Sequence, residues 1–247
     1  MPELPLSGRT ALVTGGAVRI GRAIALHLAA EGANVAIHHG RSKAQADEVV
    51  AELTAMGVNS CAVQADFAEA SPSLAATLFD QIESQLGPVA ILVNSAAIFE
   101  AGTLVSTTPE SWDRHFAINL QAPVWLSQQF ARRLPADRDG AIVNLIDWRG
   151  LRPPPGHLAY TLTKAALVAA TRMLAQELGP RIRVNGVAPG AILPAPGDDP
   201  KTFEQRGSRN PLQRTGSPED IADAIVYLVT ARFVTGEIVS VTGGEQL

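Results

Sequence analysis

The chain has 247 residues, of which 46% are apolar and 18% are charged, and its formal net charge is −4. This length and composition predict one folded α/β domain with a sizeable core and exclude a disordered chain. The acidic balance argues against a nucleic-acid-binding surface. The single cysteine, Cys61, excludes an intramolecular disulfide framework and a zinc site built from several cysteines. The five histidines lack the spacing of metal ligands, so we expect no metal centre.

The N-terminal sequence has no basic segment followed by an apolar run, which is the pattern of a signal peptide. No stretch of about twenty residues is apolar enough to cross a bilayer. We therefore expect a cytoplasmic protein that acts on a small molecule, without a membrane or a nucleic acid as partner.

Short apolar runs alternate with segments of helical periodicity along almost the whole chain. The apolar runs predict strands at 10–15, 33–39, 58–66, 89–97, 140–147, 181–189 and 237–243. The periodic segments predict helices at 20–32, 43–57, 73–87, 109–133, 157–178 and 217–230. Pro123 falls inside one of these helices, so we expect a kink or a break near it.

Strands that alternate with helices predict repeated βαβ units and a parallel sheet. We expect residues 1–247 to form a single Rossmann domain of the α/β class. The sheet is predicted to be doubly wound, mostly parallel and seven-stranded, with helices on both faces. The proline- and glycine-rich stretch 186–216 is the one long irregular segment, and residues from about 190 to 211 are predicted to form a substrate loop. Ligands of such sheets bind at the carboxyl ends of the strands.

A glycine-rich turn at 14–21 joins the first predicted strand to the first predicted helix. Glycine allows a ligand to approach the backbone closely, and a helix N-terminus offers free N–H groups to a pyrophosphate. This context predicts a dinucleotide site that includes Gly15, Ile20 and Gly21, although a plain strand–helix turn is the alternative. Arg19 is either a ligand of a cofactor phosphate and of the substrate or a solvated loop arginine.

The end of the second predicted strand indicates which dinucleotide binds. An NAD site usually carries an acidic residue there for the ribose 2′-hydroxyl, whereas residues 38–42 read His-His-Gly-Arg-Ser. Arg41 can form paired hydrogen bonds with a 2′-phosphate, and Ser42 can donate from the start of the next helix. Together with His39, these residues predict NADPH as the cofactor; a surface arginine is the alternative for Arg41.

The ends of the third and fourth predicted strands complete the cofactor prediction. Asp66 and Phe67 are placed to contact the adenine, although Asp66 could equally be a plain helix cap. Asn94 and Ala96 belong to a group of small residues that lets a ribose or a nicotinamide lie close to the backbone.

Tyr160 and Lys164 lie four residues apart on one predicted helix and therefore share a face. The chain has only two tyrosines and three lysines, so chance is a weak explanation of the pair. A lysine ammonium beside a phenol favours the phenolate, which predicts a lowered tyrosine pKa and a general acid–base group. The alternative is a tyrosine at the edge of the core with a lysine that reaches to solvent.

With these motifs the whole chain resembles the short-chain dehydrogenase/reductase superfamily. The resemblance rests on the turn 14–21, Asp66, residues 94–97, Asn119, the Tyr160-x-x-x-Lys164 pair and Pro189-Gly190. It implies that Tyr160 is the proton donor and that Lys164 binds the nicotinamide ribose and tunes Tyr160. It also implies that Asn119 holds the long helix open for a water, that Pro189 and Gly190 border the nicotinamide, and that the protein is a homotetramer.

Asp147 departs from the pattern of most of the family, which has a serine about thirteen residues before the tyrosine. An ionised carboxylate only accepts hydrogen bonds, so it would repel a carbonyl oxygen and suit a nitrogen heterocycle with N–H groups. The alternative is that Asp147 caps a turn and that catalysis is lost or rerouted. The aspartate, with Arg19 and Arg41-Ser42, narrows the resemblance to pteridine reductases and dihydromonapterin or dihydrofolate reductases. Phe99 stands where these enzymes carry the aromatic residue that stacks on the pterin.

The sequence thus predicts an NADPH-dependent reductase that reduces a C=N bond of a pterin or dihydropterin. The predicted catalytic residues are Asp147, Tyr160, Lys164 and Asn119, and the predicted substrate-binding residues are Arg19, Phe99, Asp147 and Tyr160. One alternative is a carbonyl reductase of the same fold that acts on 3-oxoacyl or other keto substrates. Another is a non-catalytic NADPH-binding sensor, which the intact Tyr160–Lys164 pair disfavours.

Overall fold

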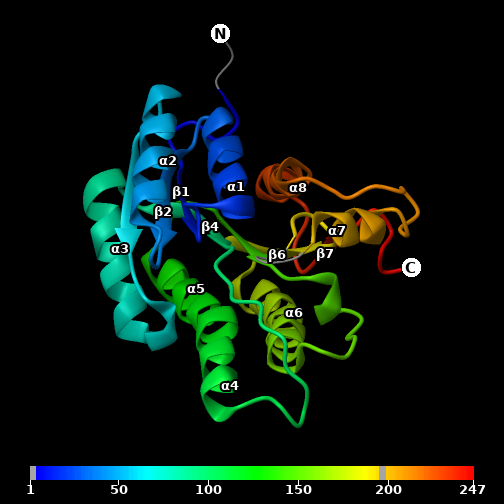
Figure 1. Ribbon diagram of the computed structural model, residues 1–247. Coiled ribbons are helices and arrows are strands. Elements are labelled where there is room, and N and C mark those ends of the chain that lie inside the picture. The colour runs from blue at the N-terminus through cyan, green and yellow to red at the C-terminus, as the bar shows by residue number, and fades with distance from the viewer. Residues whose placement is uncertain (1–3, 195–198) are drawn as a thin grey trace.

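A parallel sheet forms the centre of the molecule. The computed structural model describes residues 4–194 and 199–247, and within them seven strands follow the order β3-β2-β1-β4-β5-β6-β7 (Figure 1). The strands are β1 (Thr10–Thr14), β2 (Asn34–His39), β3 (Ser60–Gln64), β4 (Val89–Asn94), β5 (Gly140–Leu145), β6 (Ile182–Pro189) and β7 (Ile238–Val241). Every neighbouring pair is parallel. The prediction of a doubly wound, seven-stranded sheet is confirmed.

Helices cover both faces of the sheet, as predicted (Figure 1). One face packs against α1 (Arg19–Ala30), α2 (Lys43–Ala55) and α8 (Pro218–Thr230), and the other against α3 (Pro72–Leu86), α5 (Ala122–Arg133) and α6 (Leu158–Leu178). Successive side chains of β1 show why its sequence is continuously apolar: Ala11 and Val13 pack into the first core, and Leu12 packs into the second. Both faces of the strand are therefore buried.

The strand order reverses between β1 and β4, which are neighbours in the sheet but not in the chain. The crossovers on either side of this point leave in opposite directions, which opens a crevice at the carboxyl ends of the two strands. The glycine-rich turn follows β1, and residues 94–97 begin at the last residue of β4, so both lie at this crevice. The fold thus brings the two halves of the predicted cofactor site together.

The predicted helix 109–133 consists of three parts. α4 (Pro109–Phe116) and α5 are joined by a π-helical turn, Ala117–Gln121. The expected irregularity is present, but it lies one turn before Pro123. Proline has no N–H for the carbonyl of Asn119, four residues earlier, and its ring crowds that carbonyl, so the wider turn forms there.

The stretch 186–216 is not irregular throughout, and the prediction is wrong for α7 (Pro200–Gly207). The Asp199 carboxylate accepts hydrogen bonds from the backbone N–H groups of Lys201 (3.4 Å) and Thr202 (3.2 Å) at the start of this helix. α7 is short and has a single large apolar side chain, Phe203, so it shows no helical periodicity in the sequence. Part of the predicted substrate loop, 195–198, lies outside the described residues.

Among the described residues, none of the helices has both the length and the apolar character that crossing a membrane requires.

Candidate active site

The glycine-rich turn packs closely against the end of β4. Thr14 Oγ1 accepts hydrogen bonds from the backbone N–H groups of Ser95 (2.9 Å) and Ala96 (3.0 Å). Gly15 has a φ of +65°, and a Cβ atom there would lie 3.1 Å from the Ala96 Cα atom. The position therefore needs glycine both for its backbone conformation and for the close approach of β4.

The N-terminus of α1 follows this turn. The first turn of α1, all of which is described, carries no acidic side chain and includes Ile20 and Gly21. Its free N–H groups and positive partial charge suit an anion. Arg19 is exposed, and its Nη2 atom donates a hydrogen bond to the Pro194 carbonyl oxygen at 2.7 Å. The structure thus joins Arg19 to the start of the predicted substrate loop.

Two buried polar atoms near the crevice fit a bound polar ligand. His39 Nδ1 and Asn94 Oδ1, at the ends of β2 and β4, have no hydrogen-bond partner among the described residues. Buried polar atoms are nearly always paired, so both atoms have unused capacity that a ligand across the strand ends could fill. Arg41 lies exposed just after β2, and Ser42 precedes α2. This arrangement fits the predicted 2′-phosphate site.

Asp66 and Phe67 lie at the start of a short 3₁₀ helix, Phe67–Glu69. Asp66 Oδ1 accepts a hydrogen bond from the Ala68 N–H at 2.9 Å, so the aspartate is a helix cap, which was the alternative interpretation. Phe67 is buried, and its ring stacks on that of His38 with centroids 3.9 Å apart. These contacts fix the backbone beside the predicted adenine position.

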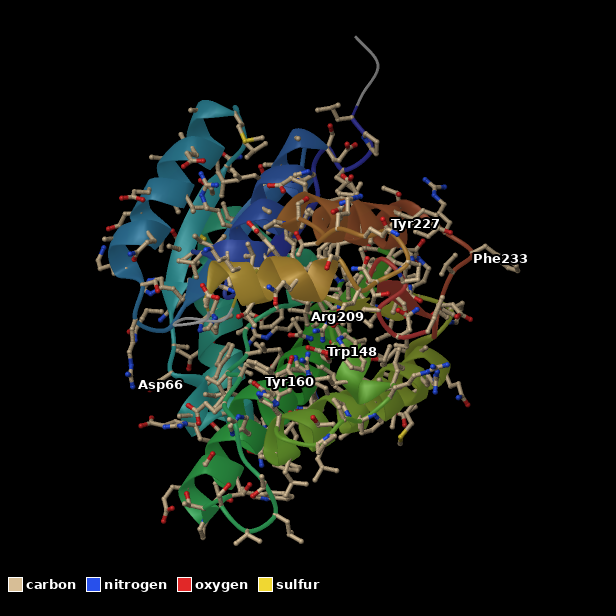
Figure 2. All side chains as sticks on the ribbon, turned by 45° about the vertical axis from the view of Figure 1, so that its right-hand side comes forward. Asp66, Trp148, Tyr160, Arg209, Tyr227 and Phe233 are labelled. Atoms are coloured by element: carbon tan, nitrogen blue, oxygen red, sulfur yellow. The ribbon has the colours of Figure 1, made fainter. Side chains whose placement is uncertain are left out.

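Tyr160 and Asp147 meet across the carboxyl end of β5. Tyr160 lies in the first turn of α6 (Figure 2). Its hydroxyl donates a hydrogen bond to Asp147 Oδ2 at 2.9 Å. Asp147 Oδ1 accepts from the Arg149 N–H at 2.8 Å and so caps the 3₁₀ turn Trp148–Gly150. One carboxylate therefore both caps the turn and contacts the tyrosine hydroxyl, so capping the turn does not by itself imply that catalysis is lost or rerouted.

The pKa of Tyr160 differs from our expectation. Burial raises it well above 10, the negative charge and hydrogen bond of Asp147 raise it further, and Arg149 opposes the rise. The lysine was expected to lower this pKa, but the dominant influences are burial and the carboxylate. At neutral pH Tyr160 therefore carries its proton, as a general acid must.

Lys164 is buried beside Tyr160, one turn further along α6. Its Nζ donates to the Leu145 carbonyl oxygen at 2.8 Å and lies 5.7 Å from the centre of the Tyr160 ring. Burial lowers the pKa of Lys164 to about 8, although the charge of Asp147 opposes this effect. The ammonium group is thus charged at neutral pH and close to losing its proton.

Asn119 connects the π-helical turn to the segment after β4. Its Oδ1 accepts from the Ile98 N–H at 2.9 Å, and its Nδ2 donates to the Ile98 carbonyl at 3.0 Å. Nδ2 also lies 3.4 Å from Thr163 Oγ1 on α6. Asn119 therefore positions the chain leading to Phe99 as well as the helix that carries Tyr160 and Lys164.

Phe99 lies in an aromatic cluster beside Tyr160. The Phe99 ring stacks on His157 at 4.3 Å between centroids and contacts Tyr160 edge-on at 4.7 Å. It remains 41% exposed. An aromatic surface of this kind suits a flat heterocycle, although His157 already occupies one of its stacking contacts.

Arg149 and His157 contact this cluster, and the sequence did not single them out. The Arg149 guanidinium carbon lies 5.3 Å from the centre of the Phe99 ring, and its Nη1 is 3.4 Å from both Asp147 oxygens. Both residues come from the segment between β5 and α6. Arg149 follows the end of β5, and His157 immediately precedes α6. These positions are their only sequence signal, and they do not indicate where either side chain points.

Pro189 ends β6, and Gly190 follows it, on the same edge of the sheet. The Gly190 N–H donates to the Val241 carbonyl at 3.0 Å, and a Cβ atom there would lie 2.8 Å from Thr242 Cα. The backbone of Gly190 therefore packs directly against the end of β7 and the residue that follows it.

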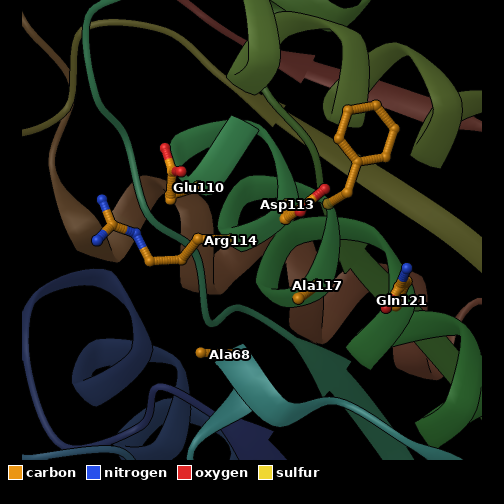
Figure 3. A pocket seen from close by; sticks show the side chains of 7 residues that line it. Ala68, Glu110, Asp113, Arg114, Ala117 and Gln121 are labelled. Atoms are coloured by element: carbon orange, nitrogen blue, oxygen red, sulfur yellow. The ribbon is translucent and has the colours of Figure 1, made fainter. Parts of the chain in front are cut away.

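An open recess of about 410 Å³ lies beside α4 and shares no residue with the predicted site (Figure 3). Its walls include Ala68, Glu110, Asp113 and Gln121. Arg114, also on its wall, is held by the Glu100 carboxylate at 2.6 Å. The second tyrosine, Tyr227, lies on α8, well away from Tyr160 (Figure 2).

Known proteins resemble this chain over nearly its full length. A family model described as enoyl-(acyl carrier protein) reductase matches residues 16–246. A short-chain type dehydrogenase/reductase of Picea abies is 37% identical, with 97% of this chain and 93% of the relative covered. The 3-oxoacyl-[acyl-carrier-protein] reductase FabG of Staphylococcus aureus is 38% identical, with 96% and 97% covered.

Solved structures show the same similarity. FolM alternative dihydrofolate reductase 1 from Brucella canis, complexed with NADP, superposes with a TM-score of 0.91 at 39% identity, covering 99% of this chain and 96% of that one. A short-chain dehydrogenase from Burkholderia cenocepacia in complex with NADP gives a TM-score of 0.91 at 37% identity, with 98% and 100% covered. The chain is a member of the short-chain dehydrogenase/reductase family.

Proposed function

We propose that this protein is an NADPH-dependent reductase that reduces a C=N bond of a pterin or dihydropterin. The proposal rests above all on the 2.9 Å hydrogen bond from Tyr160 to Asp147, which puts a carboxylate where most relatives have a hydroxyl. A carboxylate accepts hydrogen bonds but cannot donate them to a carbonyl oxygen. It would also oppose the negative charge that develops on such an oxygen during reduction.

A nitrogen heterocycle avoids this conflict. Asp147 would accept a hydrogen bond from a ring or amino N–H, and the ring nitrogen that is reduced takes up a proton instead of carrying a negative charge. The exposed part of Phe99 supplies an aromatic surface for the flat ring. Arg19, held by the Pro194 carbonyl, would lie between a cofactor phosphate and the edge of the substrate.

The cofactor site is assigned to the same edge of the sheet. Gly15, the first turn of α1 and Arg19 would hold the pyrophosphate, and Arg41 and Ser42 would hold the 2′-phosphate. His39, Asn94 and Ala96 would line the space between β2 and β4, Asp66 and Phe67 the adenine end, and Pro189 and Gly190 the nicotinamide end. NADP in the solved relatives from Brucella canis and Burkholderia cenocepacia supports this assignment.

The reaction needs one hydride and one proton. When bound, NADPH would supply the hydride that a ring carbon takes up. Tyr160 gives its hydroxyl proton to the adjacent ring nitrogen, so its hydroxyl turns from Asp147 to the substrate. The Lys164 ammonium, 5.7 Å from the ring, stabilises the phenolate that remains. Asn119 does not contact the substrate; it positions α6 through Thr163 and the segment that leads to Phe99 through Ile98.

A carbonyl reductase is the second candidate, and the 38% identity to the Staphylococcus aureus FabG supports it. This function would require a keto substrate to bind despite the Asp147 carboxylate. A non-catalytic NADPH-binding sensor is disfavoured by the intact set of Tyr160, Lys164 and Asn119. The sensor would keep its biological role in Tyr160→Phe, whereas an enzyme would lose nearly all turnover.

We also propose a cytoplasmic homotetramer. The outer side of α6 exposes Leu162 and Met173, the second of which is 58% exposed. Apolar side chains on this long helix would be covered if α4, α5 and α6 pack against a second copy. Light scattering on the purified chain would give the mass of the assembly.

Replacing Asp147 tests the assignment of the substrate. Asp147→Ser restores a hydroxyl donor, so we expect at least about a tenfold loss of kcat/KM with dihydropterins and a gain with a small ketone. Asp147→Asn is the matched control, because it keeps the size of the side chain but removes its charge. A parallel loss with both substrate classes in Asp147→Ser would contradict the proposed role.

Arg41→Ala tests the choice of cofactor. Because only NADPH carries the 2′-phosphate, we expect KM for NADPH to rise about tenfold and KM for NADH to change by less than about twofold. Arg41→Lys keeps the positive charge, so its KM for NADPH should lie between those of the wild-type protein and Arg41→Ala. An equal rise with both cofactors would remove Arg41 from the 2′-phosphate site.

The pKa of Lys164 predicts the alkaline limit of activity. The ammonium group loses its proton as the pH rises through about 8, so kcat/KM for NADPH should fall about tenfold per pH unit above that value. Lys164→Arg keeps a positive charge and should lose this limb of the profile. A flat profile up to pH 9.5 in the wild-type protein would show that the charge of Lys164 is not needed.

A further inference from the structure

His38 is a buried histidine of β2 that the proposed mechanism does not use. Only 3% of the residue is exposed, and its ring contacts the glycine-rich turn. The side chain has hydrogen-bond partners on two different segments. Each segment lies just beyond the end of a strand that pairs with β2: one follows β1 and the other follows β3.

The first partner is the turn itself. The Gly15 N–H donates to His38 Nδ1 at 3.3 Å, and the Gly16 N–H donates to the His38 carbonyl oxygen at 3.1 Å. One residue of β2 thus accepts both of the first two amide groups of the glycine pair. These two hydrogen bonds tie the glycine pair, which leads into the N-terminus of α1, to β2.

The second partner lies on the segment after β3. His38 Nε2 donates to the Ala65 carbonyl oxygen at 3.0 Å, and the ring stacks on Phe67 at 3.9 Å with an angle of 15° between the planes. Ala65 directly precedes Asp66. His38 therefore bridges the turn assigned to the pyrophosphate and the segment assigned to the adenine.

The two hydrogen bonds fix the state of the ring. An amide N–H can only donate, so Nδ1 must be unprotonated, and a carbonyl can only accept, so Nε2 must carry the proton. Only the neutral imidazole meets both conditions. Burial lowers the pKa of His38 to about 4; the hydrogen bond to the Ala65 carbonyl opposes this effect, His39 lowers the pKa further, and Asp66 raises it. The ring is therefore neutral under ordinary assay conditions.

We propose that His38 is a positioning residue for NADPH, which holds the phosphate-binding turn at a fixed separation from the adenine end of the site. This inference rests on the proposed NADPH dependence. His38 does not need to touch the cofactor, because it acts through Gly15 on one side and Ala65 on the other. Its loss should weaken cofactor binding more than it slows the chemical step.

Three substitutions separate the functions of the two ring nitrogens. His38→Phe keeps the stacking on Phe67 but loses both hydrogen bonds. His38→Asn places an acceptor near the position of Nδ1 and can still bind the Gly15 N–H, whereas His38→Gln keeps only a donor near Nε2. His115→Phe is the matched control, because His115 is also buried but lies on α4.

The test measures the dissociation constant of NADPH by fluorescence titration and the turnover number at saturating NADPH. We expect His38→Phe and His38→Gln to raise the dissociation constant about five- to tenfold, His38→Asn less, and the turnover number of each to stay within about twofold. His115→Phe should bind NADPH as the wild-type protein does. Unchanged binding in His38→Phe, or an equal loss of binding and turnover in all three His38 variants, would overturn the proposal.

A second measurement needs no cofactor and is made on the wild-type protein, with His38→Asn used only to assign the signal. In a two-bond ¹H–¹⁵N spectrum of the wild-type protein at pH 7, the His38 ring, identified by its absence from His38→Asn, should show an unprotonated Nδ1 and a protonated Nε2. The opposite tautomer or a charged ring would refute the bridge. Failure of the wild-type protein to bind NADPH would instead refute the proposed function, so the two failures are distinguishable.

Discussion

The hydrogen bond between Tyr160 and Asp147 is the interaction on which the active site depends. It joins the segment after β5 to the first turn of α6, and it involves both the group that we propose as the proton donor and the group that we propose selects the substrate. The same carboxylate also accepts hydrogen bonds from the backbone N–H and the guanidinium group of Arg149, so two residues, Tyr160 and Arg149, set its position. A hydroxyl in its place would favour a carbonyl substrate, whereas the carboxylate favours a nitrogen heterocycle.

The doubly wound sheet supplies the frame for this interaction. The reversal of strand order between β1 and β4 places the glycine-rich turn and Asn94 at one crevice, and the neighbouring strands β5 and β6 bring Asp147 and Pro189 to the same edge. Burial then changes the chemistry of the side chains. It raises the pKa of Tyr160, which keeps its proton, and it lowers the pKa of Lys164 to about 8. His38 accepts hydrogen bonds from the Gly15 and Gly16 N–H groups of the glycine-rich turn.

The sequence predicted features that depend on periodicity and spacing. The alternation of strands and helices predicted the parallel sheet, and the four-residue interval between Tyr160 and Lys164 predicted that they share a face of one helix. It did not predict α7, because a short helix with one apolar side chain has no periodic signal. Pro123 predicted an irregular helix but not that the wide turn would form at Asn119. The tyrosine–lysine pair suggested a lowered tyrosine pKa, whereas burial and Asp147 raise it, since neither effect can be read from spacing.

The residues that escaped prediction act through three-dimensional contacts. In the sequence, His38 is one residue of a buried strand, and nothing distinguishes a core histidine from one that holds the glycine-rich turn. Arg149 and His157 lie in the segment between β5 and α6, where side-chain directions depend on the local turn. Two of the aromatic cluster's contacts, those of Phe99 with His157 and Arg149, therefore became visible only in the folded chain.

The most direct measurement is the rate of NADPH oxidation by the purified wild-type protein with dihydropterins, dihydrofolate and small ketones as separate substrates. The proposed chemistry predicts efficient oxidation with a dihydropterin and little with any ketone. Turnover of a ketone or 3-oxoacyl substrate, with none of any dihydropterin, would contradict the role of Asp147 and identify the protein as a carbonyl reductase.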